Sequence, residues 1–220
     1  MAVSQELPQD TQAFLRKWRE RWPHWQIALP FVPRQQQLQA EAWFALLAEW
    51  RDAALAGEDA TPGLAKLAWW QEELRGWSNG VRRHPLGAVL QKQPVHWQTL
   101  ADALPALRHR EQMRGEPAQA LAALQPFAQA AAQTENALWP STAIAPENWA
   151  HLWLAEAAVR GQLGYATHFW HERWPQNIAT AAPARRAHAA LLRLHVADAQ
   201  RGRASSIWRS LWMLWKAARN

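Results

Sequence analysis

An all-α fold is predicted for this chain by its residue composition, by its hydrophobic spacing and by the places where proline and glycine fall. Alanine, leucine, glutamine and arginine dominate the 220 residues, whereas β-branched residues, which favour strands, are scarce. Proline and glycine fall between segments more often than within them. A chain of this length can bury one substantial core. We therefore expect a single helical domain over residues 1–220, in which 1–33 is an N-terminal helix with a proline-containing connection.

Helices are expected over most of the chain, and each is bounded by a proline or glycine signal. The first covers about residues 8–22 and ends near Pro23, and the second, 34–56, has an apolar stripe at helical spacing. A break at 57–63 precedes a third helix that stops near Asn79-Gly80. Further helices are expected near residues 94–112, 116–139, 146–174, 181–201 and 204–219, separated by Gly115, Pro140, Pro146, Pro175 and Gly202.

Charge and composition restrict the classes of partner. The net charge of +6 and the sequence pI near 10.7 favour anionic partners, which include diphosphates, phospholipid surfaces and nucleic acid. The chain has no cysteine, so disulfides, thiolate metal sites and a cysteine nucleophile are excluded. The N-terminal segment has acids and no early apolar run, and no segment reaches the roughly 18–20 consecutive apolar residues of a membrane span. We expect a cytoplasmic protein.

Residues 66–85, KLAWWQEELRGWSNGVRRHP, carry the most specific pattern in the chain. A Lys-Leu-x-x-Trp-Trp helix with a following acid and a later His-Pro step resembles the squalene/phytoene synthase family. The resemblance covers residues 34–92 well and 147–219 loosely, and it implies a shortened helical bundle of the isoprenoid (terpenoid) synthase type. The residues that carry the pattern here are Lys66, Leu67, Trp69, Trp70, Glu73, His84 and Pro85, and we expect Trp69, Trp70 and Trp77 to pack between helices.

The same resemblance implies two aspartate-rich motifs that hold magnesium and ionise a prenyl diphosphate, and both are degenerate here. At the first motif only Asp52 occupies an acidic position, whereas Arg51 and Leu55 stand where two further acids belong. Glu49 lies three residues before Asp52 and could share its helix face. At the second motif no acid remains. The five aspartates of the chain are Asp10, Asp52, Asp59, Asp102 and Asp198, and no two are three or four residues apart.

Loss of a diphosphate leaves a charge that must be neutralised by metal ions or fixed donors, so a chain without these acids is expected to be a non-catalytic pseudoenzyme. It would bind a prenyl or lipid-like ligand, or a protein partner in an assembly role, without a cofactor. The alternative is an active prenyltransferase that condenses farnesyl or geranylgeranyl diphosphate with magnesium. Remnant catalytic candidates are Glu49 and Asp52, and candidate ligand-binding residues are Arg51, Trp70 and Tyr165.

Two histidine patterns have a functional and a structural interpretation. His168, His171 and Glu172 form a His-x-x-His-Glu cluster, in which His168 and His171 are weak candidates for transition-metal ligands. Because no further ligand is evident, we expect a surface or partly buried pair. Asp52 is a separate weak candidate, as a remnant magnesium ligand. His188, with His195 and Asp198, lies on one face of a later helix, where a polar face is the simpler interpretation.

The C-terminal segment SIWRSLWMLWKAAR places an apolar stripe beside basic residues. It resembles the closing helix of non-catalytic relatives of the family, including assembly factors of respiratory complex I. Such a stripe could lie in a membrane interface or contact a partner, but a helix that closes a bundle shows the same spacing, and we expect core packing. The basic clusters elsewhere match no nucleic-acid-binding module, so no nucleic acid partner is expected. The stripe consists of Trp208, Leu211, Trp212 and Trp215, beside Arg209, Lys216 and Arg219.

Overall fold

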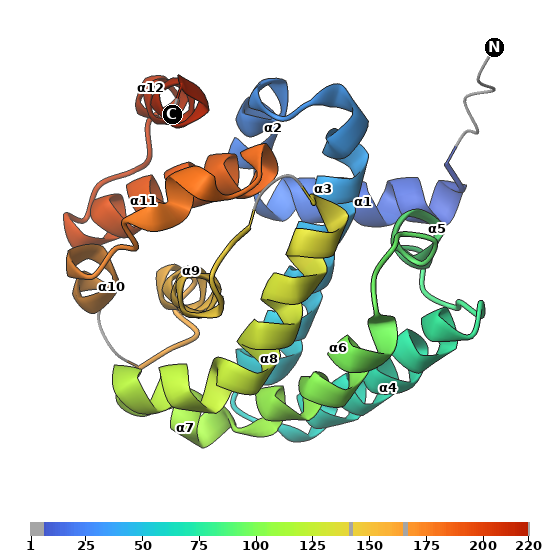
Figure 1. Ribbon diagram of the computed structural model, residues 1–220. Helices are drawn as coiled ribbons and strands as arrows, with labels where there is room; N and C mark the ends of the chain where they lie inside the picture. Colours follow the sequence, from blue (N-terminus) through green and yellow to red (C-terminus); the bar gives the residue numbers. More distant parts are fainter. Residues whose placement is uncertain (1–6, 141–142, 165–166, 220) are drawn as a thin grey trace, which may run out of the picture.

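Every regular element in the described part of the chain is a helix (Figure 1), so the all-α prediction is confirmed. The computed structural model describes residues 7–140, 143–164 and 167–219. In order, the elements are α1 (Gln9–Arg21), α2 (His24–Ala28), the 3-10 helix η1 (Leu29–Phe31), α3 (Arg34–Leu55), α4 (Thr61–Ser78), α5 (Gly87–Leu90), α6 (Trp97–Ala103), η2 (Leu104–Arg108), α7 (Arg110–Arg114), α8 (Pro117–Leu138), α9 (Pro146–Val159), α10 (His168–Glu172), η3 (Asn177–Thr180), α11 (Pro183–Gln200) and α12 (Ile207–Arg219).

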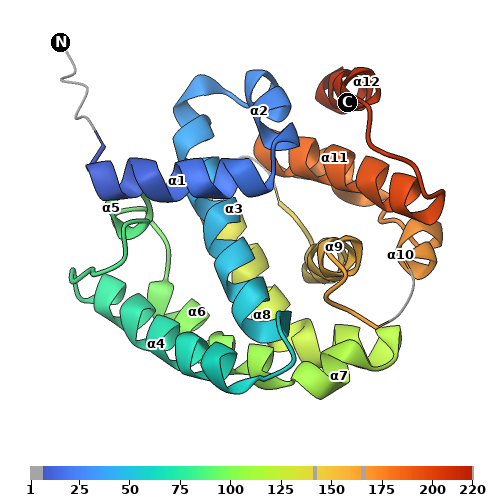
Figure 2. The same ribbon diagram turned by 180° about the vertical axis from the view of Figure 1, so that it is seen from behind.

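The centre of the fold is made by α3, α8 and α9 (Figures 1 and 2). Aromatic side chains of the three helices pack against one another. Trp50 of α3 packs edge-on against Phe127 of α8, with ring centroids 5.7 Å apart, and Phe127 packs in the same way against Trp149 of α9 at 5.5 Å. Of the 17 tryptophans in the chain, 13 are buried. Edge-to-face contacts add to the large apolar area that each ring buries. The tryptophans are therefore mainly core residues.

The remaining helices cover this centre from three sides. Helices α4 to α6 lie on one side and α10 to α12 on the other, while α1 crosses the back (Figure 2). One hydrophobic cluster extends from Leu15 in α1 to Leu214 in α12, so the central helices and the helices around them share one core. No helix in the described residues is both long and apolar enough to cross a bilayer.

Local turn chemistry explains the boundaries that the sequence predicted well. The helix expected at 34–56 is observed at Arg34–Leu55, and Gly57, at a φ of +72°, provides the left-handed turn that follows it. Helix α4 begins at Thr61, with Pro62 in its first turn, and the Thr61 N–H donates to Asp59 Oδ1 at 2.9 Å. The third helix stops as expected before Gly80, which has a φ of +80°.

Two expected helices are wrong in extent. The single helix at 146–174 ends at Val159, because the chain turns at Gly161 with a φ of +68°, and only the short α10 and η3 follow. The helix at 94–112 is divided into α6, η2 and α7. Pro105, the second residue of η2, lacks the N–H that a continuous α-helix requires. Periodicity alone did not reveal these breaks.

Candidate functional site

The Trp-Trp motif forms a structural clamp centred on Glu73. This carboxylate is 1% exposed, and its Oε1 accepts from three donors: the indole Nε1–H of Trp77 at 2.8 Å, the Arg83 N–H at 2.7 Å and the His84 N–H at 2.8 Å. Oε2 accepts from Arg83 Nε at 3.0 Å. Burial opposes the charge, but these donors outweigh it and lower the pKa of Glu73. The acid of the motif thus ties the 83–84 turn to α4.

His84 completes this clamp through its ring. It lies 4.4 Å from Trp70 and 4.8 Å from Phe14, centroid to centroid, and its Nδ1 accepts from the Leu86 N–H at 3.2 Å. Burial lowers the pKa of His84 to about 4, which keeps the ring neutral at neutral pH. Trp70, Glu73, Trp77 and His84 of the motif are therefore engaged in packing and in holding a turn. The expectation that Trp69 packs between helices was wrong, because its side chain is 37% exposed.

Two substitutions at Glu73 are expected to show whether its hydrogen bonds or its charge stabilises the turn. Glu73→Ala removes both, whereas Glu73→Gln removes the charge and keeps an acceptor. In Glu73→Ala the buried donors of Trp77, Arg83 and His84 lose their acceptor, so we expect a loss of about 3 kcal/mol in the free energy of unfolding. Glu73→Gln keeps one carbonyl oxygen for the three Oε1 donors and should lose only about 1 kcal/mol. Urea denaturation monitored by circular dichroism measures both, and equal losses for the two variants would contradict the clamp.

Glu49 and Asp52, the remnant catalytic candidates, are each paired with a cation from a different helix. Glu49 forms an ion pair with Lys66 of α4. Asp52 pairs with Arg21 of α1, and its Oδ1 accepts from Gln162 Nε2 at 2.8 Å. Both carboxylates are mostly covered, with side-chain exposures of 18% and 17%. No group of three or more metal-ligating side chains is found in the described residues.

Arg51, a candidate ligand-binding residue, is 1% exposed and faces a carboxylate of α9. Its Nη2 lies 2.8 Å from Glu156 Oε1, and Arg160 Nε donates to the same oxygen at 3.1 Å. Arg51 Nε has no hydrogen-bond partner among the residues described. Burial lowers the pKa of Arg51, and its attraction to Glu156 opposes that shift. As placed, this guanidinium neutralises Glu156 inside the bundle.

Glu156 belongs to a buried charge network that sequence reasoning missed. On its other side, Glu156 Oε2 lies 3.3 Å from His188 Nε2, and His188 Nδ1 lies 3.3 Å from Arg185 Nη1. Arg185 Nε then donates to Glu135 Oε2 at 3.0 Å. Glu135 Oε1 also accepts from the indole N–H groups of Trp43 and Trp149, both at 2.8 Å. The network, defined as Arg51, Glu135, Glu156, Arg160, Arg185 and His188, joins α3, α8, α9 and α11.

The hydrogen bonds of His188 define its tautomer. Arg185 can only donate, so His188 Nδ1 accepts and Nε2–H donates to Glu156. Burial lowers the pKa of His188 to about 4, and the ring is stacked on Phe44 with centroids 4.5 Å apart. The polar helix face expected at His188 and Asp198 lies inside the bundle, where both side chains are buried. Of the network residues, Glu156 had a signal in the sequence, because it is a charge inside the apolar segment LAEAAV.

The remaining predicted site residues are dispersed. Trp70 is 0% exposed and packs edge-on against Trp50 at 5.9 Å, so its ring is covered by protein. His168 is exposed and lies 3.4 Å from Glu172, whereas the buried Nδ1 of His171 has no hydrogen-bond partner in the described chain. Tyr165 lies outside the described residues. Trp70, His168 and His171 do not converge on one cavity.

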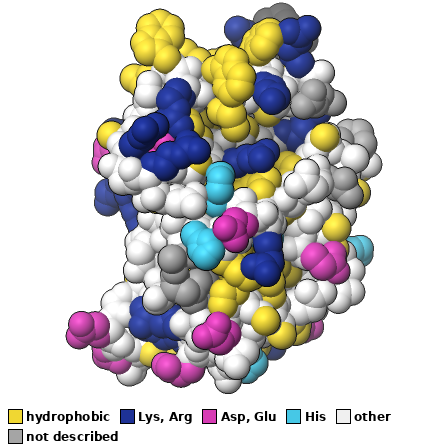
Figure 3. All heavy atoms as spheres, turned by 90° about the vertical axis from the view of Figure 1, so that its left-hand side faces the viewer, with side chains coloured by type: hydrophobic (Ala, Val, Ile, Leu, Met, Phe, Trp, Pro, Cys, Tyr) yellow, Lys and Arg dark blue, Asp and Glu magenta, His cyan; other side chains and the backbone are white. Residues whose placement is uncertain are grey.

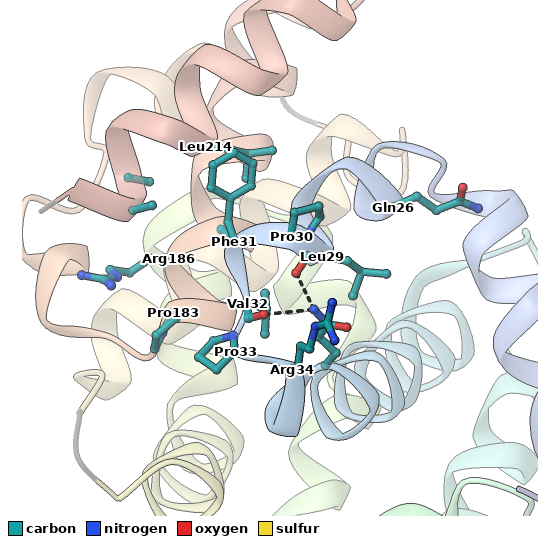
Figure 4. A pocket seen from close by; sticks show the side chains of 14 residues that line it. Gln26, Leu29, Pro30, Phe31, Val32, Pro33, Arg34, Pro183, Arg186 and Leu214 are labelled. Atoms are coloured by element: carbon teal, nitrogen blue, oxygen red, sulfur yellow. Dashed lines mark hydrogen bonds between the residues drawn. The ribbon is translucent and has the colours of Figure 1, made fainter. Parts of the chain in front are cut away.

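A hollow lies instead between the ends of α3, α11 and α12. It consists of two adjoining cavities of about 810 and 370 Å³, which share Arg186 and Ala217 and which we call the α12 cleft. In Figure 4, Arg34 lies on one side of the larger cavity and Arg186 on the other. The dashed bonds run from Gln37 to the carbonyls of Leu29 and Val32, at 2.9 and 3.1 Å, and hold the wall in place. Its apolar lining includes Leu29, Phe31, Val32, Trp174, Ile178, Met213 and Leu214.

The α12 cleft is strongly basic. Arg34, Arg186, Arg193 and Lys216 line it, no acidic residue does, and within the described chain none of the four forms an ion pair. The buried Nε of Arg186 also lacks a hydrogen-bond partner there. An apolar cleft edged by unpaired cations fits a ligand with an anionic head and a hydrocarbon body.

Two helix N-termini add to this charge. The first turns of α3 and α11 line the larger cavity, and neither has a side-chain cap on its free N–H groups. The positive ends of their dipoles favour an anion. The C-terminal end of α12 also reaches the cleft, but its last turn carries Lys216 and Arg219, which offset its carbonyls.

Comparison of the chain with models of known families, with curated proteins and with solved structures gives no match in any of the three. The α12 cleft was not predicted from the sequence, because its cations are far apart along the chain and were not distinguishable from ordinary surface arginines.

Proposed function

We propose that this protein is a non-catalytic, squalene/phytoene synthase-like helical protein that binds an anionic amphiphile, such as a prenyl diphosphate, in the α12 cleft. The observation that carries the proposal is the pairing of charges. The acids at the expected metal motif are neutralised by protein cations, whereas the four cations of the α12 cleft form no ion pair with an acid in the described residues. Free positive charge is thus available at the cleft and not at the motif.

The dimensions of the hollows support the same choice. Near the motif, a cavity of about 240 Å³ is lined by Arg21 and Glu156, which are the partners of Asp52 and Arg51. This volume is below the usual size of a site for a drug-sized ligand. The larger cavity of the α12 cleft, at about 810 Å³, lies within that range. Diphosphate oxygens would face Arg34 and Arg186, and the isoprenoid chain would lie along the apolar lining.

Binding is tested with farnesyl diphosphate in a thermal-shift and calorimetric titration. At a concentration of about 100 times Kd the ligand should stabilise the folded protein by about 2.7 kcal/mol, which corresponds to a rise in Tm of roughly 5–10 °C. The double variant Arg34→Gln/Arg186→Gln should bind about tenfold more weakly or worse, because charge-assisted hydrogen bonds are lost. Arg16→Gln is the matched control, since Arg16 is an exposed arginine of α1.

Catalysis is tested in the same samples with magnesium and labelled farnesyl diphosphate. We expect no condensation product, because no magnesium-binding set of carboxylates is free at the motif. A prenyl product that disappears in Asp52→Ala would overturn the non-catalytic proposal. If wild type and Arg34→Gln/Arg186→Gln bind farnesyl diphosphate with equal affinity, the proposal that the ligand binds in the α12 cleft is wrong.

A further inference from the structure

Helix α12 presents its most apolar face to solvent, contrary to the packing expected from the sequence. Trp208, Trp212 and Trp215 are 80%, 57% and 50% exposed, and Ile207 is 58% exposed. Only one other tryptophan, Trp69, is among the exposed large hydrophobic side chains of the described residues. The three α12 tryptophans are spaced i, i+4 and i+7 and therefore share one helix face. We call this face the tryptophan face.

The orientation of α12 is fixed by contacts on its opposite side. Arg209 Nη1 donates to the buried Asp198 of α11 at 2.5 Å, and Ser205 Oγ donates to the same carboxylate at 3.1 Å. Ser210 and Leu214 are 0% and 1% exposed. These contacts hold the helix on α11 with the tryptophan face outward, so its exposure is a consequence of specific anchoring.

The surroundings of the tryptophan face are cationic. Helix α12 contains no acidic residue, and Lys216 and Arg219 lie over the rings of Trp212 and Trp215, at 5.5 and 4.5 Å from the ring centroids. The basic α12 cleft adjoins its C-terminal half. Figure 3 shows hydrophobic side chains along the top of the molecule, with Lys and Arg side chains among and below them.

From this pattern we infer that the tryptophan face docks on an anionic lipid bilayer, with α12 parallel to the membrane surface. Tryptophan favours the headgroup level, where its ring is in apolar surroundings and its N–H remains wet. Basic residues beside such a face gain attraction from anionic lipids. A lipid surface is favoured over a protein groove because the cations lie among the aromatic rings, where a groove would bury them without partners. This membrane contact is separate from ligand binding in the α12 cleft.

The test is co-sedimentation with phosphatidylcholine vesicles that do or do not contain phosphatidylserine. Wild type should bind the phosphatidylserine vesicles, and Trp208→Ala/Trp212→Ala should bind about tenfold more weakly or worse. Trp69→Ala, which removes the exposed tryptophan of α4, is the matched control and should bind as wild type does. Arg219→Gln and added salt should each weaken binding to the anionic vesicles.

Circular dichroism of each variant shows that it is folded, and farnesyl diphosphate titration of Trp208→Ala/Trp212→Ala should match wild type, because neither tryptophan lines the α12 cleft. The two measurements distinguish a failure of the proposed ligand binding in the α12 cleft from a failure of the proposed membrane contact. The inference is overturned if wild type does not bind phosphatidylserine vesicles, or if it binds only duplex DNA or only a protein. It is also overturned if Trp208→Ala/Trp212→Ala binds these vesicles as well as the control Trp69→Ala does.

Discussion

Acidification from about pH 7 to about pH 5 is expected to destabilise the protein by about 3–4 kcal/mol through His151 and His188 alone. Burial lowers the pKa of each to about 4, against 6.5 for an ordinary histidine, and the side chains are 7% and 2% exposed. Between these pH values the unfolded chain binds more protons than the folded one. This contribution to stability is therefore complete above about pH 6.5 and is lost as the pH falls toward 4.

Two further histidines act in the same direction. Burial lowers the pKa of His84 and of His195 to about 4, and both are partly exposed, so each adds less than a fully buried ring. The buried carboxylates of Glu73 and Glu156 lose their contribution to stability at a lower pH than these histidines do. The pKa of Glu73 and that of Glu156 are lowered from 4.5, so the stability that they contribute is lost only as the pH falls below that value.

Urea denaturation at a series of pH values measures this effect. In His151→Gln, an uncharged amide can still donate to the Trp170 carbonyl, which lies 3.1 Å from His151 Nε2, and the pH dependence should be smaller by about 2 kcal/mol. His96→Asn, at an exposed position, should retain the wild-type profile. A free energy of unfolding that is constant between about pH 7 and about pH 5 would contradict the neutral, buried state of these rings.

Replacement of Glu135 by alanine is expected to lower the free energy of unfolding by about 3–5 kcal/mol. Glu135 and its partner Arg185 are 2% and 3% exposed. Without the carboxylate, Arg185 stays buried without an anion, and the indole N–H groups of Trp43 and Trp149 lose their acceptor. The loss is large because several groups lose one shared partner.

The double variant Glu135→Leu/Arg185→Met tests whether the loss of stability in Glu135→Ala comes from leaving Arg185 buried without an anion. Because removal of both charges leaves no unpaired ion, it should be more stable than Glu135→Ala, although the two indole donors stay unsatisfied. Glu20→Ala, at an exposed position of α1, should change stability by less than about 0.5 kcal/mol. Equal stability of Glu135→Ala and Glu20→Ala would show that Glu135 is not held in the network.

The clearest agreement between sequence and structure is in the fold class and in the long helices. Helices α3, α4 and α8 begin and end within a few residues of their predicted limits, because the proline and glycine residues near their ends act locally. The break after Val159 and the division at Pro105 were missed, since a helical composition continues through both. Of the candidate site, the sequence placed Glu49, Arg51 and Asp52 on one helix but could not show their partners.

Charge pairing and helix orientation needed the tertiary structure. The sequence alone determined that the protein is helical, rich in tryptophan, basic, and without the clustered aspartates of a metal-dependent synthase. Only the packing decided that Arg51 neutralises Glu156, that Glu73 ties a turn to α4, and that the tryptophan face of α12 points outward. The physical reason is that propensity and capping act over a few residues, whereas ion pairs and burial join residues that are up to about a hundred positions apart.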